Sequence, residues 1–328
     1  MSKTLDLVII GGGCAGLSLA TELAKTGYSG RLLIIEARKT YAHDRTWCFW
    51  APRKHTLADI VSKTWDSWTL SNAATSITQV GDTRIYQQIR SIDFYIQKLK
   101  ELAAFSNIEL QLNSPVTDIL ECGSRAKIIT DSDSYVANQI IDTRPPSLTA
   151  QSAPVWQIFS GGEVVVDRPV FDVETAGLMT SLEAGRVGLK FVYVLPQTPN
   201  TALVQTTYFS RSLFPAKRLD DVFAQDLHEV AGPNAQIKRW ERGVLPMGLH
   251  PPERKDSAYT LSAGMAAGAL RASSGYAFSR IQLWARQTAK HLCRGLPLEP
   301  ARHGDALEAM MDKIFLKAFA RNPEYAPS

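Results

Sequence analysis

Three glycines near the start of the chain have the spacing of a phosphate-binding turn. Gly11, Gly13 and Gly16 match the pattern G-x-G-x-x-G, and they follow an apolar run of strand length over residues 5–10. The first glycine permits the tight turn, the second lets the backbone approach a pyrophosphate, and the third lets the helix pack closely on the strand. A helix that begins here would direct unpaired N–H groups and its positive dipole end at the pyrophosphate. The spacing therefore predicts a dinucleotide site.

An acidic residue stands at the distance that such a site requires. Glu36 follows Gly16 by twenty residues and closes a second apolar run, where a carboxylate hydrogen-bonds the adenosine ribose. An acid suits a free 2′-hydroxyl, so FAD or NAD is favoured over NADP. The start of the motif close to residue 1 is typical of FAD-binding chains and favours FAD. The alternative is a tight strand–helix turn that binds no ligand.

The elements that would position these residues form a βαβ unit. The sequence predicts a helix over residues 14–26 and a second strand over 31–36, with a break at 28–30 between them. Residues 38–50 are predicted to be a loop rich in aromatic and charged side chains, and residues 92–105 a helix. Short strands are predicted over 67–70, 84–86, 108–112, 116–120, 126–130 and 139–142.

A proline-containing stretch from Pro145 to Pro154 marks a change of domain. Strands are predicted beyond it, over 156–159, 163–166, 190–195, 202–209, 237–244 and 258–263. Helices are predicted over 217–232, 277–294 and 305–320. The predicted fold class is α/β, a Rossmann-type, doubly wound FAD-binding domain with an inserted, mostly antiparallel β-sheet substrate domain. The predicted FAD-binding domain comprises 1–75, 105–150 and 256–300, the substrate-binding domain 76–104 and 151–255, and the C-terminal helix 301–328.

The composition limits the partners and the location. The 328 residues, 45% of them hydrophobic, suffice for two domains with a substantial core. The basic residues behind the net charge of +4 are scattered, so no nucleic acid partner is expected. The six histidines form no cluster with ligand spacing, and no metal site is expected. The chain begins without an export signal and contains no bilayer-length apolar run, so we expect a cytoplasmic protein.

Five strings in the chain resemble those of the bacterial lycopene cyclase family of FAD proteins. The family carries a Thr-Trp-(small)-Phe string after the ribose acid, an Asp-(small)-Arg string, a Phe-Val-Tyr-x-Leu-Pro strand and a late Arg-Pro-Ser/Thr-Thr-Gly-Tyr string. Segments 44–50, 141–144, 191–196 and 268–278 correspond to these four strings, and segment 243–247 is the fifth that resembles the family. Their order and spacing agree with the family, and the likeness covers nearly the whole chain.

The resemblance implies a flavin held in its reduced state, with NAD(P)H as the expected reductant, and a reaction without net redox change. A proton is delivered to a terminal double bond of a linear C40 polyene, the resulting carbocation closes into a ring, and loss of a proton completes the product. Such chemistry needs a buried general acid and an apolar, water-free pocket. It also needs groups that stabilise the cation, such as aromatic faces. The implied partner is a carotenoid-like apolar small molecule.

Further cofactor contacts are expected outside the glycine turn. Arg45 would meet a phosphate or the edge of the flavin, and Asp142 and Arg144 stand at the end of a strand facing the cofactor crevice. The small residues over 264–275 would let backbone N–H groups approach the flavin. There are simpler alternatives. Trp47 would be an ordinary core aromatic residue, Asp142 and Arg144 would form only an ion pair, and residues 264–275 would be a plain loop. The candidate cofactor-binding residues are Gly11, Gly13, Cys14, Ala15, Gly16, Glu36, Ala37, Arg45, Thr46, Trp47, Asp142, Arg144, Gly264, Ser274, Gly275 and Tyr276.

Two positions depart from the family pattern. Family members carry Leu-(Val/Ile)-Glu-x-Thr, with the glutamate regarded as the acid–base residue, where this chain has Gln205. An amide has no acidic proton to give to an alkene. Thr180 likewise stands where family members commonly carry a carboxylate. The candidate catalytic residues are therefore Gln205, Glu163 and Asp172, although both acids are more typical of surface or turn positions, and a reduced flavin could donate the proton instead.

Two other functions stay open at this point. One is an NAD(P)H-dependent flavin oxidoreductase or monooxygenase that acts on another apolar or aromatic substrate, and the other is a non-catalytic flavin-binding protein. Apolar residues over 307–318 have helical spacing. This stretch would dock on lipid at the inner face of the membrane, as a polyene enzyme requires, or pack in the core.

Overall fold

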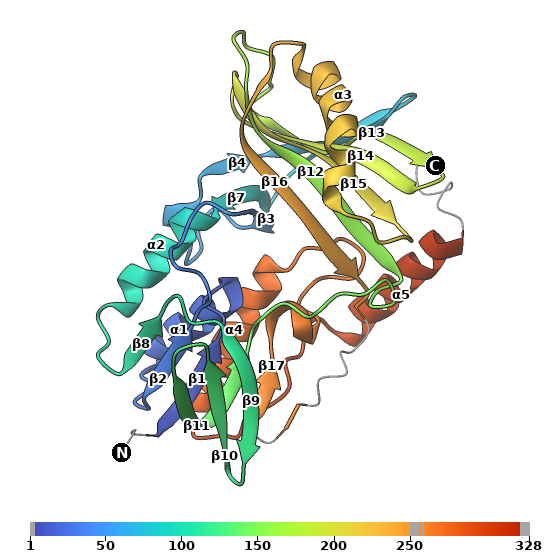
Figure 1. Cartoon of the computed structure of the whole chain (residues 1–328). Coiled ribbons are helices and arrows are strands. Elements are labelled where there is room, and N and C mark those ends of the chain that lie inside the picture. The colour runs from blue at the N-terminus through green and yellow to red at the C-terminus, as the bar shows by residue number, and fades with distance from the viewer. Residues whose placement is uncertain (1–3, 250–255, 258, 322–328) are drawn as a thin grey trace.

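The computed structural model describes residues 4–249, 256–257 and 259–321, and their strands form three sheets (Figure 1). The first sheet has the order β8-β2-β1-β11-β10-β9, with β17 paired to β11. β1 runs parallel to both β2 and β11, which is the Rossmann arrangement predicted from the glycine turn. Its strands are β1 (Leu5–Ile10), β2 (Leu32–Ile35), β8 (Ile108–Gln111), β9 (Val116–Cys122), β10 (Arg125–Thr130), β11 (Ser134–Asp142) and β17 (Thr260–Ser262).

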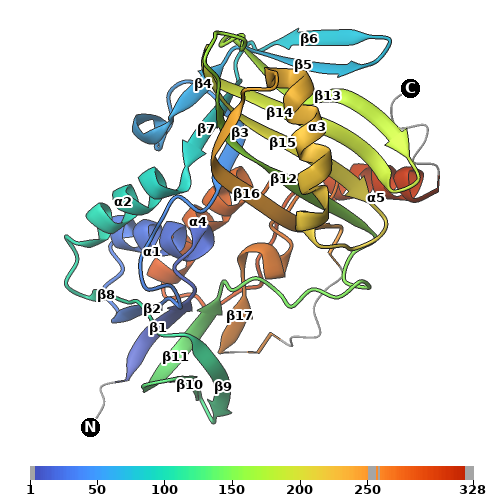
Figure 2. The same ribbon diagram turned by 45° about the horizontal axis from the view of Figure 1, so that its top comes forward.

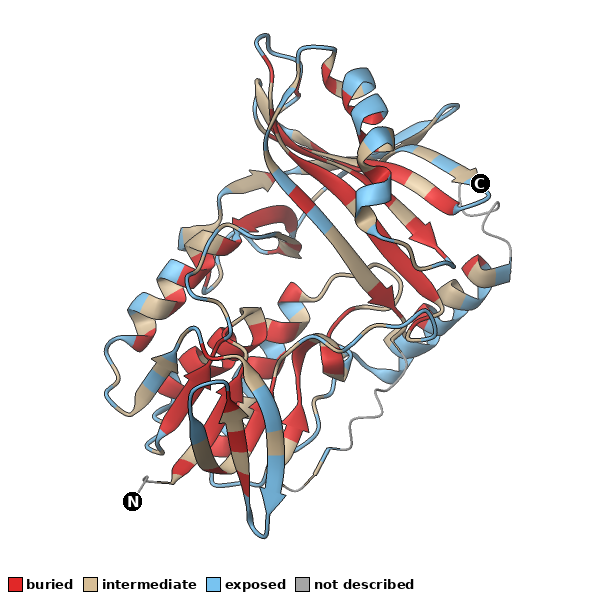
Figure 3. Cartoon of the chain, viewed as in Figure 1, coloured by how far each residue is buried: buried red, intermediate tan, exposed pale blue. Residues whose placement is uncertain are grey.

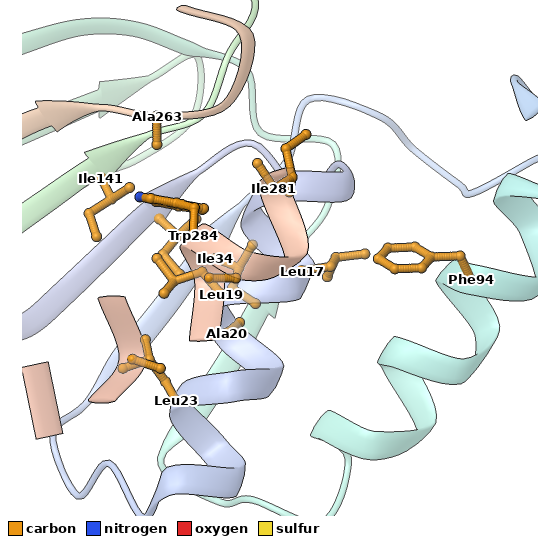
Figure 4. Packing of buried hydrophobic residues seen from close by; sticks show 14 of the residues in the cluster. Leu17, Leu19, Ala20, Leu23, Ile34, Phe94, Ile141, Ala263, Ile281 and Trp284 are labelled. Atoms are coloured by element: carbon orange, nitrogen blue, oxygen red, sulfur yellow. The ribbon is translucent and has the colours of Figure 1, made fainter. Parts of the chain in front are cut away.

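Helices from both ends of the chain pack together on this sheet. They are α1 (Cys14–Thr26), α2 (Ser91–Leu102) and α4 (Phe278–Cys293). Leu17, Leu19 and Leu23 of α1 are fully buried, and Figure 4 shows Leu17 beside Phe94 of α2 and Leu19 close to Trp284 of α4. The apolar positions of α1 recur at helical spacing, so the pattern that predicted the helix also predicts its buried face.

The second sheet is large and mostly antiparallel, with the order β16-β12-β15-β14-β13-β5-β6 (Figure 2). α3 (Asp220–Ala231) covers one face, where Phe223 packs with Val192 and Val204. The sheet agrees with the predicted inserted domain. Its strands are β5 (Ser67–Asn72), β6 (Ser76–Val80), β12 (Val155–Val165), β13 (Thr175–Gly185), β14 (Gly188–Thr198), β15 (Thr201–Ser210) and β16 (Gln236–Met247).

β12 is one continuous strand where the sequence predicted two. Gly161 and Gly162 stand at the predicted break, but both pair on either side with β15 and β16. A Cβ atom on Gly161 would lie 2.1 Å from the Val204 carbonyl oxygen, and one on Gly162 would lie 2.1 Å from the Arg239 carbonyl oxygen. These glycines therefore serve the close approach of neighbouring strands rather than a turn.

A small third sheet connects the two large ones. It has the order β3-β7-β4, formed by β3 (Thr46–Ala51), β7 (Ile85–Arg90) and β4 (Lys63–Trp65). The prediction of a loop over residues 38–50 was therefore wrong for its second half. The aromatic and branched side chains of Thr46–Ala51 favour a strand, and β7 provides its antiparallel partner. The short 3₁₀ helices are η1 (Ala58–Ile60), η2 (Ala216–Leu219) and η3 (Gly264–Ala267).

Two segments, β5 and α2, do not pack with the domain to which the prediction assigned them. β5 pairs with β13 and so belongs to the second sheet, although residues 67–72 were assigned to the FAD-binding domain. α2 packs on α1 of the first sheet, although residues 91–102 were assigned to the substrate-binding domain. Neither contact can be predicted from the local sequence, because the partner of each segment lies far away in the chain.

The last described helix, α5 (Ala306–Arg321), packs along the end of the second sheet and is exposed on its outer side (Figure 3). Phe319 is buried and packs on Phe209 with Phe315, at ring-centroid distances of 6.2 and 6.4 Å. Asp312 fixes the helix to the preceding loop by accepting hydrogen bonds from Arg271 Nε and the Ala272 N–H, both at 3.2 Å. Among the described helices, none combines the length and the apolar character that crossing a bilayer demands.

Candidate functional site

A cavity of about 700 Å³ lies where the first and second sheets face each other. Most of the candidate cofactor-binding residues stand on its wall: Gly11, Gly13, Cys14, Ala15, Glu36, Ala37, Arg45, Thr46, Trp47, Arg144, Gly264, Ser274, Gly275 and Tyr276. Gln205 stands on the wall too, with other residues of the second sheet. One space therefore joins the predicted dinucleotide turn to the predicted substrate sheet.

The glycine turn leaves room for a pyrophosphate. Gly11 has φ +98°, a left-handed conformation that favours glycine, and a Cβ on Gly16 would lie 1.9 Å from the Gly11 carbonyl oxygen. Gly13 caps α1 without any side-chain hydrogen bond, so the N–H groups of the first helical turn remain free for a ligand. The nearest atom to a Cβ built on Gly13 is Arg38 Nη2 at 3.7 Å. These features fit the diphosphate of FAD.

Glu36 is held at the end of β2 by a network of donors. One carboxylate oxygen accepts a hydrogen bond from the Gly12 N–H at 2.7 Å, and the other accepts one from the Arg38 N–H at 2.8 Å. The Arg38 guanidinium also forms an ion pair with Glu36 at 3.1 Å. Burial acts to raise the pKa of Glu36, but the Arg38 contacts and the Gly12 N–H outweigh it, and the net effect is a lowered pKa. The carboxylate is thus fixed and charged at the predicted ribose position.

We expect Glu36→Gln to destabilise the protein in a pH-dependent manner. Because the folded-state pKa of Glu36 is lowered, its contribution is fully present above the ordinary glutamate value and is lost as the pH falls through the folded-state value. The variant should lose about 1–3 kcal/mol of unfolding free energy at neutral pH, and the difference should shrink below about pH 4. Urea titrations of both proteins across this range measure it, and a constant difference would contradict the expectation.

Arg38 was not among the predicted site residues, yet it connects several parts of the wall. Its Nη2 donates to the Gly12 carbonyl oxygen at 3.2 Å, and its guanidinium lies 4.9 Å and 5.0 Å from the ring centroids of Tyr41 and Tyr95. The one feature of the sequence that could have identified Arg38 is its position two residues after Glu36, the predicted ribose ligand.

Two predicted residues lie behind the wall and support it. Gly16 lets α1 approach the glycine turn, as its contact with Gly11 shows. Asp142 is buried and orients Arg144, whose Nη2 donates to the carboxylate at 2.7 Å and whose Nη1 donates to the Val116 carbonyl oxygen at 2.9 Å. The predicted strand end at residue 142 thus places the Arg144 guanidinium beside the cavity.

Four residues form a row across the second sheet at the cavity. Glu241 on β16 pairs with Gly161 on β12, Gly161 pairs with Gln205 on β15, and Gln205 pairs with Tyr193 on β14. Directly opposed residues of antiparallel strands share a face, so the side chains of Glu241, Gln205 and Tyr193 point to the same side. Glu241, Gln205 and Tyr193 all stand on the cavity wall.

Tyrosines form a cluster on the same wall. The Tyr86 and Tyr276 hydroxyls lie 2.8 Å apart, and Trp50 packs on both rings. Burial raises the pKa of Tyr193 to about 12 and the pKa values of Tyr86 and Tyr276 well above the ordinary tyrosine value. These phenols therefore stay neutral, and all three line the cavity.

Glu241 is a buried carboxyl group that the sequence analysis missed. It accepts hydrogen bonds from the Thr46 N–H at 2.9 Å, from the Thr46 hydroxyl at 3.0 Å and from Arg239 Nη2 at 3.0 Å. Burial raises its pKa, and this effect outweighs the lowering by Arg239 and Thr46. The only sequence signal was the position of Glu241 two residues before the Gly243–Met247 string. Its place at the cavity depends on the pairing of β16 with β12, which the sequence does not reveal.

The predicted catalytic acids lie away from the wall. Glu163 accepts a hydrogen bond from Arg239 Nη2 at 3.2 Å and contacts His43 Nε2 at 3.2 Å. Asp172 is exposed and accepts the Glu174 N–H at 3.0 Å, which is a turn contact. Among the described residues, no group of three or more His, Cys, Asp or Glu side chains is arranged to hold a metal ion.

Solved structures of other proteins share the fold of this chain. A geranylgeranyl bacteriochlorophyll reductase-like protein from Thermoplasma acidophilum aligns with a TM-score of 0.67 at 15% identity, over 98% of this chain and 86% of its own. The p-nitrophenol 4-monooxygenase PnpA from Pseudomonas putida aligns with a TM-score of 0.69 at 13% identity, over 97% and 95%. The chain thus has the Rossmann-type α/β fold with an added antiparallel sheet that these enzymes share.

The family follows from the sequence comparison. The family model described as lycopene cyclase protein matches residues 6–323, and the chain belongs to this family. A lycopene beta-cyclase from Pseudescherichia vulneris is 26% identical over 288 residues, which are 83% of this chain and 70% of that protein. A lycopene beta-cyclase from a Paracoccus species is 28% identical over 134 residues, 40% of this chain and 31% of that protein. The resemblance seen in the sequence strings is thereby confirmed.

Proposed function

We propose that the protein binds FAD and catalyses the redox-neutral cyclisation of a long, linear, apolar polyene. The observation that carries this proposal is the single cavity shared by the glycine turn and the second sheet. A cofactor bound along the turn would end against a wall of neutral aromatic and aliphatic groups. Family membership supports a carotenoid-like substrate.

The first sheet supplies the residues that would hold the cofactor. The free N–H groups of α1 would bind the diphosphate, and Glu36 would accept a hydrogen bond from the ribose. Gly264 and Gly275, which both have positive φ, would allow the backbone to approach the flavin. When bound in its reduced form, FAD supplies negative charge beside a carbocation. NAD(P)H is the reductant that we propose for it.

The second sheet and the aromatic residues next to it supply the surroundings that a carbocation needs. Tyr193 of β14, Tyr86 of β7 and Tyr276 before α4 line the cavity, and their rings would attract a cation. Leu195, Leu203 and Leu245 of the second sheet line the same cavity. Among the described residues, Glu241 is the one charged side chain that the second sheet contributes to the wall. Water therefore has few polar groups to bind at this end of the cavity, which protects a carbocation from attack by water. Phe159, also on the wall, fills the space beside Gly243.

Expression in cells that accumulate lycopene tests this function. Chromatography of the pigments should show cyclic products in cells with the protein and linear pigment in cells with the empty vector. Linear pigment left intact, with FAD bound to the purified protein, would remove the cyclase function and keep the cofactor.

A second candidate function is favoured by Gln205, which places an amide at the cavity where the family has an acid. A flavin oxidoreductase or monooxygenase needs no such acid and consumes NAD(P)H in proportion to product. A redox-neutral cyclase needs reductant only to reduce the flavin once. Measuring NAD(P)H consumption against product formation separates the two, and FAD binding without any turnover would indicate a non-catalytic flavin-binding protein.

We further propose that α5 rests on a membrane surface from which the polyene enters. The outer side of α5 carries four apolar side chains that are more than half exposed, namely Leu307, Met310, Met311 and Ile314. Their spacing places them on one side of the helix, and the exposed Lys313, Lys317 and Arg321 lie beside them. Apolar side chains flanked by basic ones favour an anionic lipid surface.

Replacing these four apolar residues together by glutamine should weaken binding to vesicles of phosphatidylcholine and phosphatidylglycerol about tenfold or more. Co-sedimentation measures the bound fraction. Leu283→Gln on α4, which is also half exposed, is the matched control and should bind like the unmodified protein. Equal binding of the fourfold variant would contradict the membrane contact.

A further inference from the structure

Proton transfer to an alkene needs an acid at the cavity wall, and three carboxyl groups stand there among the described residues: Glu36, Asp44 and Glu241. Glu36 and Asp44 belong to the dinucleotide end, and both have lowered pKa values because hydrogen bonds and arginine charges outweigh their burial. Asp44 contacts Arg38 and Arg45, each at 3.3 Å. Neither group is suited to be a proton donor.

Glu241 differs from both in its place and its surroundings. It comes from the second sheet, on the face where Gln205 and Tyr193 also point. Only 7% of its surface is exposed, and burial raises its pKa. The positive charge of Arg239 does not serve Glu241 alone. Arg239 Nη2 also contacts Glu163 and the Thr46 hydroxyl, both at 3.2 Å.

The strand between Glu241 and Gln205 carries a glycine, Gly161, in the same row, so no side chain of that strand separates the two residues. Neighbouring strands lie about 5 Å apart, so the two Cα atoms stand about 10 Å apart with Gly161 between them. A Cβ on Gly161 would lie 2.8 Å from Gln205 Cγ, which shows that the Gln205 side chain occupies the space above the glycine. Side chains at 205 and 241 therefore border the same small part of the cavity.

We propose that Glu241 is the catalytic residue that protonates the polyene in this protein, in place of an acid at position 205. This assignment rests on the proposed function. Thr46 and Arg239 are positioning residues that hold the carboxyl group against the wall.

The proposed step balances in atoms and electrons. The Glu241 O–H bond breaks, and the π electrons of the terminal double bond form the new C–H bond and leave a carbocation. The π electrons of a second double bond then close the ring. The Glu241 carboxylate removes a proton from the carbon beside the ring cation, and the electrons of that C–H bond form the ring double bond. The carboxyl group is thereby restored without any redox change.

The test uses the FAD-loaded protein with a chemical reductant and lycopene in phosphatidylcholine vesicles. Glu241→Gln should lower the rate of cyclic product formation about 100-fold or more. It should bind FAD as the unmodified protein does, measured by flavin fluorescence. Glu183→Gln, an exposed acid on β13 of the same sheet, is the matched control and should keep the full rate. Recovery of product in the double variant E241Q/Q205E would show that an acid, rather than a structural contact, had been lost.

The outcomes separate the assignment from the proposed function. Cyclisation by Glu241→Gln within about threefold of the unmodified protein overturns the role of Glu241 and leaves the cyclase function intact. No cyclisation by the unmodified, FAD-loaded protein overturns both. If Glu241→Gln does not fold, Glu241→Asp decides, because withdrawing the acid by one methylene should still cost about tenfold or more in rate, and an unchanged rate overturns the assignment.

Discussion

Gly13→Val is expected to give a folded protein that binds FAD far more weakly. A Cβ at this position meets only the far end of the Arg38 side chain at 3.7 Å, and the φ of −86° suits any residue. The added side chain would instead occupy the space that we assign to the pyrophosphate. A steric conflict of about 2–3 kcal/mol corresponds to a loss of about 30- to 150-fold in affinity. Titration of the apoprotein with FAD, followed by flavin fluorescence, measures it.

Gly16→Ala provides the contrast for this prediction. Its Cβ would lie 1.9 Å from the Gly11 carbonyl oxygen, so the helix must move away from the strand whether or not a ligand is present. We expect a loss of about 3 kcal/mol or more of unfolding free energy. A Gly13→Val protein that binds FAD normally would contradict the placement of the pyrophosphate, whatever Gly16→Ala does.

The second large effect is expected from Asp226→Ala in α3. Asp226 is buried and accepts hydrogen bonds from Lys190 Nζ at 3.0 Å and from the Thr206 hydroxyl at 2.5 Å. Removing the carboxylate leaves a largely buried ammonium group without its main counter-charge, which costs about 3–5 kcal/mol. The expected result is a lower free energy of unfolding and a weaker attachment of α3 to the second sheet, measured by urea denaturation and amide hydrogen exchange.

Asp221→Ala on the same helix is the matched control. Asp221 is exposed, and its replacement should change the unfolding free energy by less than about 0.5 kcal/mol. Equal effects of the two substitutions would show that helix propensity or the helix dipole, rather than the buried ion pair, stabilises this part of the sheet.

Much of the fold could be predicted from local patterns. The apolar run over residues 5–10, the glycines after it and the helical spacing of α1 each require the same βαβ unit, so the first sheet followed directly. β3 and the continuous β12 could not be predicted as easily. Their strand character depends on β7 in one case and on β15 and β16 in the other, which lie far away in the sequence.

The candidate site divides in the same way. At the dinucleotide end of the wall, Gly11, Gly13 and Glu36 lie close together in sequence, and local spacing was enough to select them as candidates. The substrate end depends on strand register, because Glu241 reaches the row of Gln205 only through the pairing of β16 with β12. The partners of Glu241 are Thr46 and Arg239, so nothing in the sequence around Gln205 indicates that Glu241 lies close to it.

The packing of α4 on α1 has a consequence during synthesis. The apolar side of α1 is synthesised well before α4, which covers it, because the whole second sheet precedes α4 in the chain. That sheet, apart from β5 and β6, is contiguous from β12 to β16 and can assemble first. Until α4 has been synthesised, Leu17 and Leu23 lack this cover, so we expect chaperones that hold exposed apolar helices to act on the nascent chain.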